Sequence, residues 1–370
     1  MNVTGVGSFR GSDLAPLAEK VAAGERLSFD DGVRVFTTRD FLGLGRLANF
    51  VRESRHGNAA FFNVNRYLNP TNLCWVDCAL CAWAKKVNEP GGYEMGIEEC
   101  VRHAREGYSE AVTEFHVVGG LHPYWPFEYY TGLLSALKTE FPGVHLKAWT
   151  MVEIDWIARV GRRSLGETVR SLKAAGLDSC PGGGAEIFAR RVRDVICRNK
   201  ISGERWLEVA KVCHENGVRT NATILYGSVE TVEERVDHLI RLRDLQDETG
   251  GFTGLIPLAF HPENTPLAHL PETSGQTDLR VIAASRLLLD NFPHIKAYWI
   301  QIGTKLAQVA LSFGADDLVG TLVEETITHA AGATTARGMT RVAFEEMIRE
   351  TGREPFERDS EYRRVVRPAA

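Results

Sequence analysis

The sequence predicts a parallel α/β barrel of the TIM type, with eight as the expected number of strands and with helices added at both ends of the chain. From about residue 59, short apolar runs alternate with amphipathic stretches, which is the pattern of βα units around a parallel sheet. Up to eight runs qualify as strands, and short right-handed crossovers favour a closed barrel over an open doubly wound sheet. The length of 370 residues suits one barrel with terminal additions.

The elements follow from the spacing of apolar residues. Helical spacing predicts a lead-in with helices at 12–23 and 40–52. The expected strands are 61–67, 113–118, 145–150, 177–180, 221–226, 254–260 and 296–300, with a weak eighth at 316–321. Helices expected between them include 127–141, 204–216, 232–248 and 279–291. We therefore divide the chain into a lead-in (1–54), a barrel core (55–322) and a helical extension with a tail (323–370), whose charged end is expected to be loosely attached.

Composition predicts a soluble globular protein that acts on small molecules. Hydrophobic residues make up 44% and charged residues 25% of the chain, close to the globular average. The net charge is −5 and the basic residues are scattered, so nothing indicates nucleic-acid binding. Seven cysteines, three of them clustered, and no apolar signal segment in residues 1–50 favour a reducing cytoplasm. No apolar stretch approaches the length of a membrane span.

Three cysteines directly after the first predicted strand carry most of the functional information. Cys74, Cys78 and Cys81 are close enough to converge on a soft metal centre, and a structural zinc ion would need a fourth ligand that no second cysteine pair supplies. Iron–sulfur clusters are normally held by four cysteines, so three would leave one iron open to a substrate or cofactor. The alternatives are three neighbouring core thiols or a structural metal site in a non-catalytic protein.

The spacing Cys74-x3-Cys78-x2-Cys81 resembles that of the radical S-adenosylmethionine enzymes. This resemblance implies a [4Fe-4S] cluster held by the three cysteines, with the open iron chelating the amino and carboxylate groups of S-adenosylmethionine. It also implies that Gly119 and Gly120 form the glycine motif beside that amino group; the alternative is an ordinary tight turn.

More narrowly, residues 55–358 resemble the aminofutalosine synthase family. The segments that carry the similarity are 115–130, 181–188, 245–266 and 294–321. The resemblance implies a transferase of menaquinone biosynthesis by the futalosine route, which consumes S-adenosylmethionine as a co-substrate. A 5′-deoxyadenosyl radical would add to 3-[(1-carboxyvinyl)oxy]benzoate, and aryl migration with loss of carboxylate would leave 6-amino-6-deoxyfutalosine and methionine. It further implies a flavodoxin- or ferredoxin-like electron donor and leaves a homodimer open.

Two kinds of alternative remain. Within the superfamily, the cyclic dehypoxanthinyl futalosine synthase and the deazaflavin-forming synthase use the radical to abstract hydrogen, so adenine would leave in free 5′-deoxyadenosine. In a different class, a non-catalytic protein would use the three thiols to bind zinc or another metal.

Several residues at predicted strand ends are candidates for the site. A dianionic substrate needs hydrogen-bond donors, and those expected are His122, Arg66, Asn72, His261 and Asn264. The residues expected beside S-adenosylmethionine are Glu153, Glu186, Tyr226, Gly227, Glu230 and Lys200, with Arg205 as an alternative to Lys200. Cys180 is expected to contact either the cofactor or the substrate. His122 could instead cap a helix, and the two glutamates Glu153 and Glu186 could simply favour helix starts.

The chain departs from the usual family pattern next to the cysteines. Leu80 stands where an aromatic residue commonly precedes the third cysteine, and Trp83 is expected to cover the adenine in its place. Other positions lack the basic residue or histidine that relatives often show; they are Tyr67, Asp77, Ala79 and Ser228. The remaining thiols Cys100, Cys197 and Cys213 lie in helical patterns and are expected to be buried.

Overall fold

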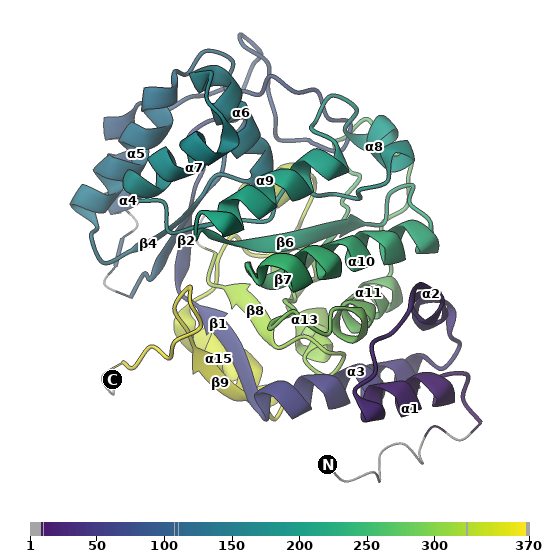
Figure 1. Ribbon diagram of the computed structural model, residues 1–370. Helices are drawn as coiled ribbons and strands as arrows, with labels where there is room; N and C mark the ends of the chain where they lie inside the picture. The colour runs from purple at the N-terminus through teal and green to yellow at the C-terminus, as the bar shows by residue number, and fades with distance from the viewer. Residues whose placement is uncertain (1–8, 10, 107, 110, 323–324, 368–370) are drawn as a thin grey trace.

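Parallel strands form the centre of the molecule and helices cover their outer face (Figure 1). The computed structural model describes residues 9, 11–106, 108–109, 111–322 and 325–367. Six strands form one parallel sheet in the order β2 (Asn65–Leu68), β3 (Glu114–Val117), β4 (His145–Ala148), β5 (Ser179–Cys180), β6 (Arg219–Tyr226) and β7 (Phe252–Ala259). A second parallel sheet has the order β8 (Asp317–Gly320), β1 (Ala59–Asn63) and β9 (Glu354–Glu357).

The two sheets continue into one another, so the strands follow each other around a barrel. β1 leads into β2 through Val64, where the chain changes its partner from β8 to β3. On the other side, Ile295 and Lys296 make single parallel bridges to β7 and β8. The predicted barrel is confirmed in a partial form. Where the seventh strand was expected, only these two single bridges are present among the described residues. A full strand at 296–300 is wrong, because the chain turns there into helix α12 (Trp299–Ile302).

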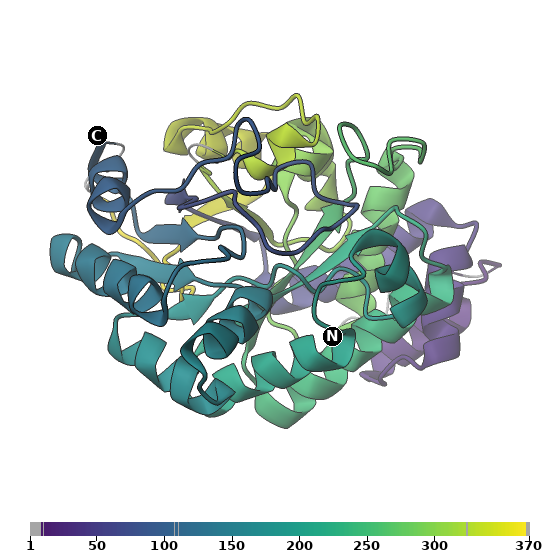
Figure 2. The same cartoon turned by 90° about the horizontal axis from the view of Figure 1, so that it is seen from above.

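Helices enclose the barrel, as the amphipathic stretches predicted (Figure 2). The lead-in forms α1 (Ala15–Ala23), α2 (Phe29–Thr37) and α3 (Phe41–His56); α2 packs against α10 and α11, and α3 packs against α11 (Figure 1). The other helices are α4 (Ile97–Glu106), α5 (Phe127–Glu140), α6 (Met151–Gly161), α7 (Leu165–Ala174), α8 (Arg190–Ile196), α9 (Gly203–Glu215), α10 (Val232–Thr249), α11 (Gly275–Leu288), α13 (Thr304–Ala310), α14 (Ile327–Ala330) and α15 (Arg341–Glu350). In the described part of the chain, none of them is both long and apolar enough to cross a membrane.

The C-terminal segment is fixed to the barrel, and the expectation of a loose tail is wrong. β9 pairs with β1, and Arg358 directly after it is 1% exposed, with its Nε donating to Asp317 Oδ2 at 2.6 Å. Ser360 donates to Glu114 at 2.6 Å, and Tyr362 to Asp317 at 2.7 Å. In a sequence, charged residues that have buried partners cannot be distinguished from solvated ones. The charged composition of this segment therefore gave no indication of strand β9.

Candidate active site at the carboxyl ends of the strands

A cavity of about 320 Å³ opens among the loops at the carboxyl ends of the strands and continues into the barrel. The loop after β2, residues 69–96, passes over the strands in dark blue in Figure 2. Apolar side chains form much of the wall, including Leu80, Val118, Val152, Ile256 and Leu258. Parallel barrels place their active sites at this end, because the loops that follow the strands converge there.

The three cysteines of the motif all line this cavity. Cys74, Cys78 and Cys81 are partly buried, whereas the other four cysteines, including those expected to be core thiols, are buried. The main-chain amides of Leu121 and Ala84 donate to Sγ of Cys74 and Cys81, each at 3.4 Å. Hydrogen bonds to sulfur stabilise a thiolate ligand and tune the metal centre that it holds.

The three thiols are not grouped as closely as the ligands of one zinc ion. Sulfurs around one tetrahedral zinc ion lie about 3.8 Å apart, given a Zn–S bond of about 2.3 Å. Among the described residues, the triad whose ligand atoms all lie within 4.8 Å of one another is His56, His294 and Asp316, and it does not include the cysteines. The three cysteines line the cavity without forming such a close group.

Burial affects the charge state of these thiols. It raises the pKa of Cys74 and raises that of Cys78 to about 12, although Lys200 acts in the opposite direction on Cys78. Binding of a metal centre by these thiols must therefore release protons. Lys200 Nζ itself lies 2.5 Å from Glu186 Oε1, so a largely buried ion pair lies beside the cysteine loop.

The turn after β3 packs directly against the cysteine loop. A Cβ on Gly120 would collide with the main-chain carbonyl of Leu73, so only glycine allows this approach. Glu153 holds the turn, since Oε1 accepts from the Gly119 amide at 2.9 Å and Oε2 accepts from the Thr150 amide at 2.7 Å. Burial raises the pKa of Glu153 to about 7 despite these hydrogen bonds.

Sequence comparisons agree with this site. Residues 68–242 match the radical SAM superfamily, and residues 249–369 match the CofH/MqnC C-terminal region. Aminodeoxyfutalosine synthase of Thermus thermophilus is 49% identical over 95% of this chain and 96% of its own length. The enzyme of the same name from Streptomyces coelicolor is 42% identical over 94% of this chain and 92% of its own. The chain belongs to the aminodeoxyfutalosine synthase family of radical S-adenosylmethionine enzymes.

The resemblance found in the sequence is thereby confirmed, and a solved structure supports the fold. The crystal structure of methylornithine synthase matches with a TM-score of 0.73, covering 92% of this chain and 97% of that chain. Its sequence identity is 18%, so the likeness concerns the barrel architecture alone.

The structure brings most residues expected beside S-adenosylmethionine to the cavity wall. Besides the two glycines, the wall includes Glu153, Glu186, Lys200 and Trp83. Glu186 has a φ of 48°, a conformation that a residue with a side chain adopts only rarely. Leu80 also lines the cavity, so this member of the family presents an aliphatic and an aromatic side chain on the same loop.

Three residues expected to bind the substrate form hydrogen bonds or ion pairs with nearby protein groups. His122 accepts two main-chain amides of its own loop at 3.0 and 3.2 Å and pairs with Glu94. Asn72 donates to one main-chain group of residues 91–93 at 2.9 Å and accepts from another at 2.8 Å. Arg66 donates to a main-chain carbonyl of α4 at 3.0 Å. None of the three lines the cavity.

Other candidates also lie outside the cavity lining. Each has a polar group that is hydrogen-bonded to another residue: Tyr226 to Asp278, Gly227 to Glu230, His261 to Gln301, Asn264 to Ala330 and Arg205 to Asp155. Cys180 is fully buried on β5 and does not line the cavity either.

Sequence reasoning missed the polar side chains inside the barrel. The cavity wall below the loops includes Glu114, His116, Lys147, Asn221, Thr223, Lys296, Tyr298 and Arg358. A signal was present, because Glu114 and His116 alternate along β3, and Lys147 lies between apolar neighbours on β4. Polar residues at every second position of a buried strand point to one face, here the interior.

Gly120→Ala is expected to lower thermal stability and weaken binding of S-adenosylmethionine. The new methyl group would meet main-chain atoms of the cysteine loop, which can yield only if that loop moves. Overpacking of this kind typically costs about 1–3 kcal/mol. Thermal unfolding and equilibrium binding of S-adenosylmethionine to the reconstituted protein measure the two effects.

Gly143→Ala is the matched control, since a Cβ at this position would have no atom within 4 Å and the φ of Gly143 is not positive. It should leave both quantities unchanged. If Gly120→Ala behaves like Gly143→Ala, neither thermal stability nor binding of S-adenosylmethionine depends on the close approach of the two loops.

Proposed function

We propose that this chain catalyses the aminofutalosine synthase reaction of menaquinone biosynthesis. The 5′-deoxyadenosyl group of S-adenosylmethionine is joined to the vinyl carbon of 3-[(1-carboxyvinyl)oxy]benzoate, the aryl group migrates and carboxylate is lost. The products are 6-amino-6-deoxyfutalosine and methionine. The observation that carries this proposal is the 49% identity, over almost the full length of both chains, to an aminodeoxyfutalosine synthase.

We propose Cys74, Cys78 and Cys81 as the ligands of a [4Fe-4S] cluster. When bound, the cluster supplies an electron that cleaves S-adenosylmethionine, and a flavodoxin- or ferredoxin-like protein is the proposed donor. The three thiols fit this group because they line the cavity, with main-chain amides directed at two of the sulfurs.

The neighbouring residues are suited to hold the nucleotide. The turn at Gly119 and Gly120 exposes main chain beside the cysteine loop, and Glu153 fixes its conformation. We assign Glu186 to the ribose hydroxyls, as carboxylates do for other nucleosides, with Lys200 setting the orientation of its side chain. Apolar walls next to these groups exclude water from a reactive carbon centre.

An anaerobic assay with adenine-labelled S-adenosylmethionine tests the proposal. The reconstituted protein is given a reductant and 3-[(1-carboxyvinyl)oxy]benzoate, and the products are separated by mass. Label joined covalently to the benzoate-derived product supports the synthase. Label found only in free 5′-deoxyadenosine would instead indicate a hydrogen-abstracting enzyme such as the dehypoxanthinyl futalosine cyclase.

A further inference from the structure

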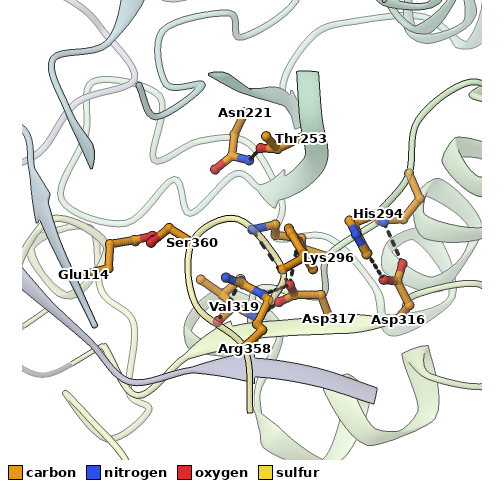
Figure 3. A network of polar contacts seen from close by, with 12 residues as sticks. Glu114, Asn221, Thr253, His294, Lys296, Asp316, Asp317, Val319, Arg358 and Ser360 are labelled. Carbon is orange, nitrogen blue, oxygen red and sulfur yellow. Dashed lines mark hydrogen bonds and ion pairs between the residues drawn. The ribbon is translucent and has the colours of Figure 1, made fainter. Parts of the chain in front are cut away.

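The inner end of the cavity carries an unbalanced set of buried charges, four of which (Glu114, Lys296, Asp317 and Arg358) are labelled in Figure 3. We call it the floor: Glu114, Lys147, Lys296 and Arg358, which line the cavity, together with Asp317, which lies next to Arg358 and Lys296. Each of these side chains belongs to a residue that is at most 5% exposed. Three cations therefore face two carboxylates, and one positive charge has no carboxylate of its own.

Two ion pairs account for both carboxylates. Lys147 Nζ lies 2.5 Å from Glu114 Oε2, and Arg358 Nε lies 2.6 Å from Asp317 Oδ2. These distances are those of charge-assisted hydrogen bonds. The unmatched cation is therefore Lys296.

The position of Lys296 agrees with this assignment. Its Nζ lies 3.9 Å from Asp317 Oδ2, which is too far for a hydrogen bond. Asp317 already accepts hydrogen bonds from Arg358, from the hydroxyl of Tyr362 and from the amide of Val319. Among the described residues, no carboxylate forms a hydrogen bond with Lys296.

An ammonium group in this position is costly to keep charged. Burial lowers the pKa of Lys296 to about 7, and Lys147 and Arg358 act in the same direction, while Asp317 and Glu114 oppose them. Buried charges normally have a hydrogen-bonded partner, because transfer from water costs several kcal/mol otherwise. An anionic group supplied by a ligand would provide that partner.

We propose that Lys296 binds the ring carboxylate of the aryl substrate, an inference that rests on the proposed function. The vinyl carbon must meet the adenosyl group at the cysteine end of the cavity, so the carboxylate on the far side of the ring reaches toward the floor. Ile256, Leu258 and Val319 also line the cavity, and these apolar side chains suit an aromatic ring. Lys296 is then a determinant of specificity for benzoates over neutral aryl ethers.

Lys296→Met tests this assignment in the reconstituted holoenzyme. The KM for 3-[(1-carboxyvinyl)oxy]benzoate should rise by about 10-fold or more, the size expected when a charge-assisted hydrogen bond is lost. The analogue without the ring carboxylate, 2-phenoxyacrylate, should show the same KM with wild type and variant. Iron content and binding of S-adenosylmethionine should not change.

Three outcomes separate the possibilities. Equal KM values of wild type and Lys296→Met for the benzoate would overturn the inference. A rise in KM of the same size for the benzoate and for the analogue would overturn it as well. Failure of the wild type to form any adduct would instead refute the proposed function. Removing a buried charge should leave the melting temperature unchanged or higher; if the methionine variant does not fold, Lys296→Gln provides the same comparison.

Discussion

Cys78→Ser is expected to remove most of the iron bound after reconstitution and to abolish adduct formation. A cluster held by three cysteines has no spare protein ligand, so loss of one thiolate should release it. Changes to groups that merely support a ligand cost about 10–100-fold, so loss of a ligand should reduce turnover by at least about 100-fold. Iron and sulfide analysis, visible absorbance and the labelled-adenine assay measure these effects.

Cys197→Ala provides the control, because this thiol lies near Cys78 but is 1% exposed and outside the cavity lining. It should retain the iron and the activity. Unchanged iron and turnover in Cys78→Ser would show that the assignment of the cluster ligands is wrong. One tightly bound zinc ion and no iron in the wild type would support the non-catalytic alternative.

The barrel and the cysteine loop could be predicted because their signals are local. The alternation of apolar runs and amphipathic stretches lies within short segments of chain, and Cys74, Cys78 and Cys81 lie on one loop. The turn at Gly119 and Gly120 was found for the same reason, since it directly follows a strand. Each of these patterns can be recognised without knowing what packs against it.

The direction of a polar side chain in a loop could not be predicted in this way. His122 stood at the correct strand end, yet its ring nitrogens are used by its own loop and by Glu94. The floor could not be predicted for a different reason. Its ion pairs join Lys147 to Glu114 and Arg358 to Asp317, which are 33 and 41 positions apart and become neighbours only when the barrel forms.

Asp317→Asn is expected to lower the free energy of unfolding by about 3–5 kcal/mol, as for other broken buried ion pairs. The substitution leaves Arg358 buried without its carboxylate and weakens the hydrogen bond that the Tyr362 hydroxyl donates to residue 317. Two contacts between the C-terminal segment and the barrel are therefore lost or weakened. Urea-induced unfolding measures the change. Asp290→Asn is the control, because its ion pair with Arg26 is exposed and should contribute less than about 1 kcal/mol.

The difference in the free energy of unfolding between wild type and Asp317→Asn should also depend on pH. Burial alone would raise the pKa of Asp317, but Arg358 and Lys296 outweigh it and lower the pKa. A carboxyl group with a lowered pKa contributes its stability above the unfolded value of about 3.9 and loses it as the pH falls through the folded value. The destabilisation should therefore be complete near neutral pH and shrink below about pH 4. A difference that is the same at pH 3 and pH 7, or no larger than that of Asp290→Asn, would mean that this ion pair does not hold the C-terminal segment in place.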